Sequence, residues 1–329
     1  MNDITKNTRC DWLERPAVEA IDAKLGVPLP VLDHGFVRVV DYMGDDAAVV
    51  QAARVSYGKG TKTLSDDRGL IRYLLKHRHT TPFEMCEIKL HVKLPIFVAR
   101  QWIRHRTANV NEYSARYSIL AREFYVPAPH AISPQSKTNR QGRDGDLPAK
   151  VRQAMAETIR IQGEIAYDLY EELFTGWPWF DQDGDLRGER EDARPHHGEH
   201  GMARELARMV LPVNAYTEWY WKIDLHNLMH FLALRTDPHA QAEIRAYADA
   251  IMSILQTWVP ISAEAFDEYL LGAETFSRSE MAYLRHWIAD VREAMETRNM
   301  NGLASQPGTG NLSAREARSF LHKLGIGDG

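Results

Sequence analysis

The sequence is poor in cysteine and has no long apolar run. Its 329 residues include two cysteines, Cys10 and Cys86, and no CxxC or Cys/His spacing typical of zinc sites, which excludes a disulfide framework. No apolar stretch approaches the length that crosses a bilayer. The segment from Met1 to Arg15 lacks the apolar core of a signal peptide. We therefore expect a cytoplasmic protein without membrane contact.

The chain also lacks an excess of positive charge. Lys and Arg number 40 against 45 Asp and Glu, so the formal net charge is −5. A general nucleic-acid binder would be basic overall, and we expect no nucleic-acid partner. Apolar residues make up 44% and charged residues 26%, as in an ordinary soluble enzyme.

Hydrophobic periodicity predicts an α+β fold with a central sheet packed with helices. The clearest strand spans 86–94, where apolar and polar side chains alternate, so one face should be buried and the other wet. Cys86 opens this strand, and we interpret it as a small core residue rather than a nucleophile. Further strands are expected at 36–40 and 216–223. Helices are predicted at 45–55, 66–77, 151–174, 202–211, 225–235, 239–257 and 262–271, with another beginning at Pro95 and delivering Arg104 to Arg106 at its end.

Polar segments divide the chain into three predicted regions. Residues 1–30 resemble an N-terminal extension, with organised sequence starting near Val31. A core domain is expected over 31–272, interrupted by polar loops at 131–150 and 178–200. Residues 273–329 form a predicted helical C-terminal extension, in which two capping boxes pair Ser277 with Glu280 and Ser313 with Glu316.

An arginine-rich segment carries the strongest functional signal. Arg100, Arg104, Arg106 and Arg116 accompany one acid, Glu112, so residues 100–116 carry a local charge of +3 (four minus one). Arg100 and Arg104 are four apart and would share a face of a helix. A solvated face is the alternative, but it would favour Lys and Glu over the amides and hydroxyls found here. Because arginine binds phosphate through two parallel hydrogen bonds, we predict a nucleotide-phosphate site.

The same segment resembles a known family. Arg104-His105-Arg106, followed after seven residues by Ser114, is similar to the signature of the flavin-dependent thymidylate synthases. The segments His79–Glu84 and Leu234–Gln241 also resemble that family, and the motifs occur in its order over about residues 32–271. One departure is Met85, where the family often has histidine after Pro-Phe-Glu.

The resemblance implies an activity and its cofactors. It implies reductive methylation of dUMP to dTMP, with methylenetetrahydrofolate as carbon donor, FAD as flavin and NADPH as reductant. No covalent cysteine nucleophile is implied, and Cys86 has no visible activating partner. Ser114 is assigned to binding, because no base with triad-like spacing is evident. The family works as a homotetramer with shared sites, and the chain has no Gly-rich Rossmann fingerprint to hold FAD within one subunit.

The resemblance also assigns site residues within the domain at 31–272. Arg235 is the expected catalytic residue, which stabilises the N3-deprotonated uracil. The expected dUMP-binding residues are Gln101, Arg104, Glu112, Tyr113, Ser114, Ala115, Arg116, Arg208 and Arg235. The expected FAD-binding residues are Ser56, His79, Thr81, Arg104, His105, Arg106, Glu112, Asp224, Leu225, His226 and His230, with His79 near the flavin and folate.

A histidine-rich segment supports an alternative reaction. His226 and His230 are four apart, and His239 lies nearby in sequence. A metal-dependent nucleotide phosphohydrolase could use such ligands. There is no HExxH motif, however, and a lone pair at this spacing is more often structural, so we predict no metal. A nucleotide- or RNA-binding module without catalysis is disfavoured by the acidic total charge.

Overall fold

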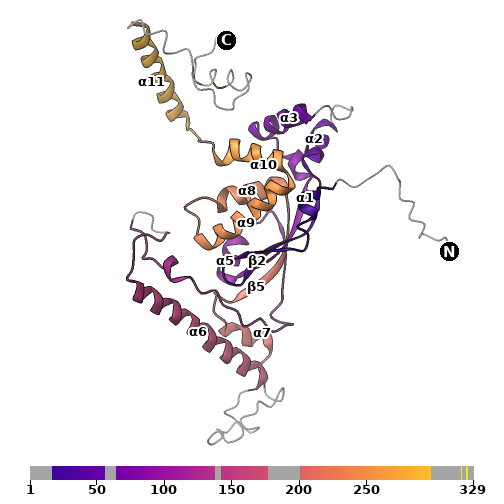
Figure 1. The fold of residues 1–329 in the computed structure, drawn as a ribbon, viewed down its shortest axis with the longest axis vertical. Coiled ribbons are helices and arrows are strands. Elements are labelled where there is room, and N and C mark those ends of the chain that lie inside the picture. The colour runs from indigo at the N-terminus through magenta and orange to yellow at the C-terminus, as the bar shows by residue number, and fades with distance from the viewer. Residues whose placement is uncertain are drawn as a thin grey trace, which may run out of the picture. The chain divides into compact units, whose positions relative to one another are not determined.

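The computed structural model describes residues 17–55, 64–137, 142–176 and 201–297, together with Phe320 and Leu324. The chain divides into two compact units, Met1–Leu271 and Gly272–Gly329. Within the first unit, α8 and α9 lie along one side of a sheet, while α6 runs apart from them (Figure 1). The predicted α+β class is confirmed.

One antiparallel sheet forms the centre of the first unit. Its strand order is β1-β2-β3-β5-β4, so β1 and β4 are the edges. The strands are β1 (Pro28–Val31), β2 (Gly35–Met43), β3 (Glu87–Pro95), β4 (Asn109–Glu112) and β5 (Tyr216–Asp224). The strands expected at 36–40, 86–94 and 216–223 are confirmed, and β2 extends further than predicted.

The central strand β3 owes its place to its alternating sequence. Ile88, Leu90, Val92 and Leu94 are buried, whereas the charged and histidine side chains between them are only partly covered. Side chains at alternate positions of a strand point to opposite faces, so one face of β3 meets the helices and the other carries polar groups.

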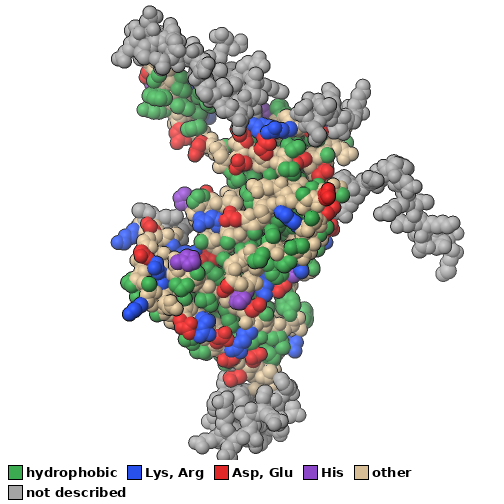
Figure 2. Space-filling model, viewed as in Figure 1, with side chains coloured by type: hydrophobic (Ala, Val, Ile, Leu, Met, Phe, Trp, Pro, Cys, Tyr) green, Lys and Arg blue, Asp and Glu red, His purple; other side chains and the backbone are tan. Residues whose placement is uncertain are grey.

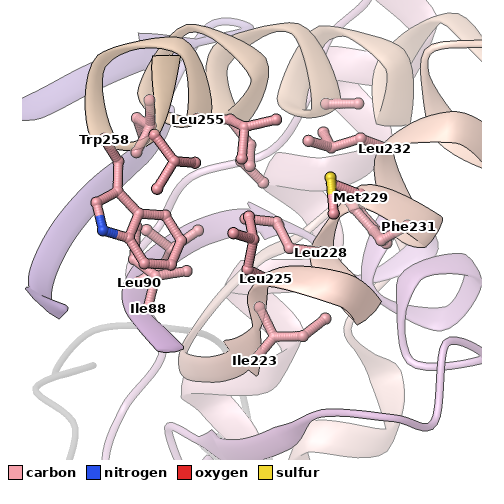
Figure 3. Close-up of a cluster of buried hydrophobic side chains, with 14 of the residues drawn as sticks. Ile88, Leu90, Ile223, Leu225, Leu228, Met229, Phe231, Leu232, Leu255 and Trp258 are labelled. Atoms are coloured by element: carbon pink, nitrogen blue, oxygen red, sulfur yellow. The ribbon is translucent and has the colours of Figure 1, made fainter. Parts of the chain in front are cut away.

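Three helices cover the apolar face of the sheet. They are α5 (Ile96–Trp102), α8 (Leu225–Arg235) and α9 (Ala242–Trp258). Figure 3 shows Leu255 and Trp258 of α9 above Leu225 and Leu228 of α8. The Trp258 indole also donates to the carbonyl of Gly44 at 2.8 Å. This packing fixes the ends of α5 and α8 against each other.

A group of helices closes one end of this core. They are α2 (Asp46–Arg54), α3 (Leu64–Lys76), α4 (Thr81–Glu84), α10 (Pro260–Phe266) and the π-helical turn η4 (Asp267–Leu271). Asp45 caps α2 by accepting from Ala48 N at 2.8 Å. Asp46 accepts from the backbone amides of Ile261 and Ser262 at 2.8 and 2.9 Å, which ties α2 to α10.

A second, smaller core lies beneath the long helix α6 (Ala149–Thr175). Phe124, Tyr167, Tyr170, Ala207 and Ala215 form its buried cluster. The short elements η2 (Pro129–Ala131), α7 (Arg204–Ala207) and η3 (Arg208–Val210) pack against α6. The helix predicted at 202–211 is therefore two short pieces.

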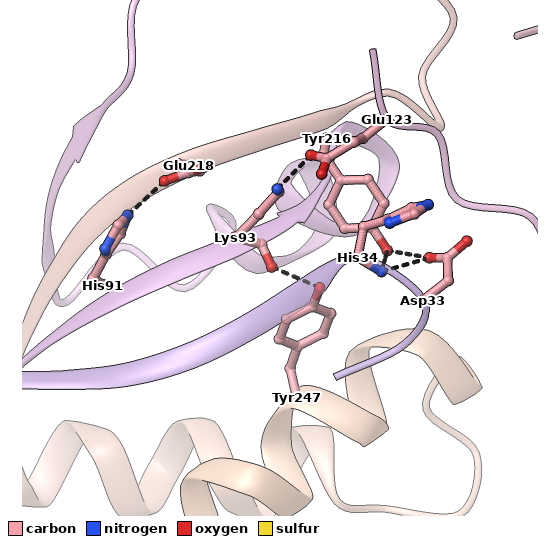
Figure 4. A network of polar contacts seen from close by, with 8 residues as sticks. All are labelled: Asp33, His34, His91, Lys93, Glu123, Tyr216, Glu218 and Tyr247. Atoms are coloured by element: carbon pink, nitrogen blue, oxygen red, sulfur yellow. Dashed lines mark hydrogen bonds and ion pairs between the residues drawn. The ribbon is translucent and has the colours of Figure 1, made fainter. Parts of the chain in front are cut away.

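A polar network joins the β1–β2 turn to the start of β5 (Figure 4). Asp33 accepts from the Tyr216 hydroxyl at 2.5 Å and from Val126 N at 2.9 Å. The Tyr247 hydroxyl donates to the carbonyl of Lys93 at 2.8 Å. Gly35 lies so close that an added Cβ would stand 2.0 Å from the Tyr247 oxygen. The network holds the end of the sheet opposite Asp224.

The structure corrects three expectations. Organised structure begins before Val31, because α1 (Glu19–Asp22) packs Ile21 into the core and β1 joins the sheet. The strand β4 was not predicted. The helix from Pro95 ends at Trp102, so Arg104 lies beyond it and shares no helical face with Arg100.

The second unit contains α11 (Arg278–Thr297). Its predicted capping box is confirmed, since Ser277 N donates to Glu280 at 2.7 Å and Glu280 N donates to the Ser277 hydroxyl at 3.3 Å. The second box, at Ser313 and Glu316, and the 178–200 loop lie outside the described residues. Among the helices described, none is both long and apolar enough to span a membrane.

Candidate active site

The last turns of α5 and α8 bring Gln101 and Arg235 together. The Arg235 Nη2 donates to the Gln101 carbonyl at 3.4 Å, across 134 residues of sequence. Among the described atoms, Gln101 Oε1 and Arg235 Nε are buried without a hydrogen-bond partner. Burial lowers the pKa of Arg235, but an arginine remains charged at neutral pH. An unpaired buried polar atom costs about 1–3 kcal/mol, so this acceptor and donor fit a polar ligand.

The Arg104-His105-Arg106 run follows α5 and alternates in exposure. His105 is buried beside His230 and Phe231, with ring centroids 5.4 and 5.5 Å away. Burial lowers the pKa of His105, and the neighbouring His230 and Arg235 lower it further. Arg104 and Arg106 are exposed, and neither forms an ion pair with any described residue. Two unpaired guanidinium groups beside a neutral ring suit an anionic ligand.

A pocket of about 250 Å³ adjoins this run. On one side it is bounded by the turn before β4 and the first residue of β4. On the other side lie the start of β3 and the end of β5. Its lining residues are Glu87, Arg106, Thr107, Ala108, Asn109, Lys222, Ile223 and Asp224. Lys222 pairs with Glu87 at 2.6 Å, so Arg106 is the cation in the lining without an acidic partner among the described residues.

The structure divides the expected FAD residues of α8 by exposure. Asp224 caps the helix by accepting from Asn227 N at 2.9 Å, while its side chain also lines the pocket. Leu225 is fully buried, and its N–H donates to the Cys86 carbonyl at 2.9 Å. Its side chain is therefore part of the hydrophobic core. His226 is half-buried and His230 is exposed.

A second polar group forms around Ser114. The Ser114 hydroxyl accepts from Arg116 N at 3.3 Å, and Arg116 Nη2 pairs with Glu205 at 3.4 Å. Arg208 Nε donates to the Glu205 carbonyl at 3.2 Å, so Arg116 and Arg208 meet at one residue. Within this group Ala115 is buried, and Tyr113 is exposed with its hydroxyl 3.3 Å from the Ile119 carbonyl.

The two groups remain separate within one chain. No hydrogen bond or ion pair between described residues joins the group at Gln101, Arg104 and Arg235 to the group at Ser114. Glu112, on the edge strand β4, lies between them in sequence and accepts from the buried Thr217 hydroxyl at 2.8 Å.

The remaining expected FAD residues come from a third region. His79 is exposed and stacks on Tyr73, with ring centroids 5.9 Å apart, and Thr81 is exposed at the start of α4. Ser56 lies outside the described residues. Among the described residues, neither His79 nor Thr81 forms a hydrogen bond, ion pair or ring contact with the arginine groups.

Several neighbours of the expected residues carried no sequence signal. Thr217 and Lys222 reach the site through strand pairing, which no local motif reveals. Thr107 immediately follows the Arg-His-Arg run, and its hydroxyl lies 3.0 Å from His105 Nε2. Its position in the sequence could have marked it.

The histidines of the metal alternative do not converge. His239 Nδ1 contacts Asp237 at 2.9 Å, whereas His230 faces His105. In the part of the chain that the structure describes, no three or more His, Cys, Asp or Glu side chains are placed to hold a metal ion. The phosphohydrolase alternative therefore gains no support.

Comparisons with known proteins identify the family of the chain. The model of the family described as "Thymidylate synthase complementing protein" matches residues 38–261. Flavin-dependent thymidylate synthases from Gluconobacter oxydans and Rickettsia bellii are 58% and 52% identical, over 84% and 91% of this chain and 84% and 96% of theirs. Structures titled UMP/dUMP methylase PolB from Streptomyces cacaoi, bound with 5-Br UMP or 5-Br dUMP, are 32% identical with TM-scores of 0.59 and 0.60. They cover 74% of this chain and 98% and 99% of theirs.

The fold, the arginine-lined site and the family match define a thymidylate synthase of the complementing type. The chain belongs to the flavin-dependent thymidylate synthase family. Its reaction is the reductive methylation of dUMP to dTMP. FAD is the cofactor, and methylenetetrahydrofolate and NADPH are the co-substrates.

Cys86 fits a synthase that uses no thiolate. It is fully buried, and burial together with the nearby Asp45 and Asp46 carboxylates raises its pKa to about 12. Its thiol donates to the Asp45 carbonyl at 3.6 Å. At neutral pH this cysteine is a packed thiol, as the sequence predicted.

Replacing Cys86 with alanine is expected to leave kcat within about twofold of wild type, because no step uses the thiol. The lost sulfur should reduce stability by roughly 1 kcal/mol, as small core truncations do. Tritium release from 5-tritiated dUMP measures the first effect and thermal unfolding the second. A loss of kcat in a variant that still unfolds cooperatively and binds FAD would contradict this assignment.

Proposed function

We propose that Gln101 and Arg235 hold the uracil ring of dUMP. The observation that carries this proposal is the pair of buried, unpartnered atoms, Gln101 Oε1 and Arg235 Nε. An acceptor and a donor side by side match the imide edge of a pyrimidine. The Arg235 charge would stabilise the N3-deprotonated uracil, since a fixed cation in a water-poor site acts strongly on developing negative charge.

We assign the phosphate of dUMP to the second group. Ser114, Arg116 and Arg208 combine a hydroxyl with two guanidinium groups. Arginine forks hold phosphate by charge-assisted hydrogen bonds. Tyr113, Ala115 and Glu112 complete the predicted segment, with Glu112 oriented by Thr217.

We assign FAD to the Arg104-His105-Arg106 run and to the adjoining pocket, whose lining includes Asp224. Arg106 is a cation without an anionic partner at the pocket wall, as an anionic dinucleotide requires. His226 and His230 extend this surface, and His79 and Thr81 would approach the flavin and folate from a different region. When bound, FAD supplies the hydride, while these side chains bind and orient it.

We propose that complete sites form between subunits of a homotetramer. Support comes from the lack of any hydrogen bond or ion pair between the two arginine groups among the described residues of one chain, because one nucleotide needs contacts from both. A neighbouring subunit can bring its Ser114 group to the Gln101–Arg235 group. The active unit would be the domain at 31–272, with 273–329 as an added helical extension.

The outer face of α6 suits contact between copies. Its inner face is buried, but Val151, Met155, Ile161 and Ile165 are 39%, 44%, 44% and 55% exposed. Along the helix they lie symmetrically about Thr158, three and seven residues to either side. Two antiparallel α6 helices related by a two-fold axis would place Val151 of one near Ile165 of the other, which is self-complementary. Figure 2 shows apolar and charged side chains mixed over this part of the surface.

Replacing Ile165 with aspartate is expected to dissociate the tetramer, because each contact would bury an unpaired charge. Light scattering should then give a smaller mass, and activity should fall with it. Arg160→Asp, on the charged face of the same helix, is the matched control and should keep the mass of wild type. A tetramer that withstands Ile165→Asp would exclude this face as the contact.

A direct experiment tests the function. The purified protein should carry flavin absorbance, and with methylenetetrahydrofolate and NADPH it should release tritium from 5-tritiated dUMP. UMP should be assayed in parallel, because the similar PolB structures are titled UMP/dUMP methylase. A colourless protein that releases no tritium after FAD is added would refute the proposal. Chelator-sensitive hydrolysis of a nucleotide would favour the metal alternative.

A further inference from the structure

Thr107 makes a contact that the proposed roles leave unexplained. It follows Arg106 directly, is exposed and lines the pocket, yet its hydroxyl lies 3.0 Å from Nε2 of the buried His105. His230 and Phe231 also pack edge-on against the His105 ring, with ring centroids 5.4 and 5.5 Å away. One hydrogen bond and two aromatic contacts therefore hold the ring.

These contacts limit how the ring can turn. The Thr107 hydroxyl, which can donate or accept, holds Nε2, and His230 and Phe231 contact the ring edge-on. Burial lowers the pKa of His105, which favours the neutral ring.

This arrangement keeps the His105 side chain inside the fold. His105 is 9% exposed, while Arg104 and Arg106, on either side of it in sequence, remain exposed. Anchoring His105 fixes the backbone between the two arginines, and with it the positions from which both guanidinium groups reach an anion. Preorganised cations lose less conformational entropy when they bind.

We propose that Thr107 is a positioning residue: its hydroxyl locks His105 as an anchor, and the anchored ring holds Arg104 and Arg106 ready for the phosphates of FAD. His105 would thus serve the FAD site through its neighbours rather than by ring contact. The positioning role rests on the proposed FAD site, because FAD affinity is the quantity that tests it. Its structural basis is the hydrogen bond between Thr107 and His105, together with the packing of His230 and Phe231 against the ring.

Thr107→Val and Thr107→Ser separate the hydroxyl from the size of the side chain. Valine keeps the shape and removes the hydroxyl, so the FAD dissociation constant should rise about fivefold to tenfold, the effect of losing one hydrogen bond. Serine restores the hydroxyl and should return the constant to within twofold of wild type. Titration of apoprotein with FAD, followed by flavin fluorescence, measures each constant.

Controls distinguish the possible failures. Thr175→Val removes a hydroxyl that bonds the Glu171 carbonyl at 2.6 Å on α6, and it should leave FAD affinity unchanged. If Thr107→Val does not fold, Thr107→Ala is the variant to test in its place. Wild type without FAD affinity would refute the FAD site itself. If wild type binds FAD and Thr107→Val or Thr107→Ala binds it equally well, the positioning role is overturned. It is also overturned if Thr107→Ser fails to restore the FAD affinity.

Discussion

Replacing Arg235 with alanine is expected to lower kcat by about 10²–10³-fold, the usual loss when a fixed donor to developing charge is removed. The chain loses a cation whose Nε is buried and unpartnered and whose Nη2 contacts the end of α5. Because the side chain makes one long hydrogen bond within the fold, the cost to stability should be small beside the cost to turnover.

Steady-state tritium release and thermal unfolding measure the two effects on the same preparation. Arg278→Ala, an exposed arginine at the start of α11 and outside the matched family span, is the control and should keep full kcat. Arg235→Lys keeps a charge but not the forked donor, so it should recover only part of the lost rate. Full activity of Arg235→Ala would refute the catalytic assignment.

Replacing Arg106 with alanine is expected to weaken FAD binding by about 10- to 100-fold, since hydrogen bonds to charged groups contribute about 1.5–3 kcal/mol. Arg106 lines the pocket and has no acidic partner among the described residues, so its removal breaks no ion pair of the fold. The unfolding temperature of the apoprotein should therefore match wild type. FAD titration of the apoprotein at several salt concentrations gives the constant.

Salt dependence supplies the control for that prediction. Wild type should lose FAD affinity as salt rises, and Arg106→Ala should lose less, because one charge contact is already missing. Lys222→Ala is the matched pocket variant: its ammonium already pairs with Glu87 at 2.6 Å, so the loss of affinity should be smaller. Equal affinity of Arg106→Ala and wild type would remove Arg106 from the site.

Local sequence predicted the elements whose cause is local. The alternation of β3 predicted its span and both faces. The helix expected at 225–235 begins where predicted, because the Asp224 carboxylate accepts from Asn227 N. The capping box at Ser277 was visible for the same reason. In each case the interaction that sets the boundary involves residues close in sequence.

Elements that depend on distant partners could not be predicted from the sequence. Three of the four residues of β4 are polar and all four are exposed, and they form a strand because β5, about a hundred residues later, pairs with them. The prolines of β1 disfavour a central strand but are tolerated at an edge, which is where β1 lies. Long-range pairing overrode weak local preference in both.

The candidate site shows the same division. The motif marked Arg104, Arg106 and Ser114, but it could not show that His105 turns inward or that Leu225 belongs to the core. Those facts depend on how α5 packs against α8. The contact of Gln101 with Arg235 likewise follows from helix packing alone.

The separation in sequence between contacting site residues sets an order for folding during synthesis. Glu112 meets Thr217 across 105 residues, and Gln101 meets Arg235 across 134. A ribosome-bound chain that has emerged only to α6 contains the Arg-His-Arg run but neither β5 nor α8 to receive it. Nucleotide binding should therefore appear late, after residue 235 has left the exit tunnel, and truncated nascent chains would expose their arginines without forming a site.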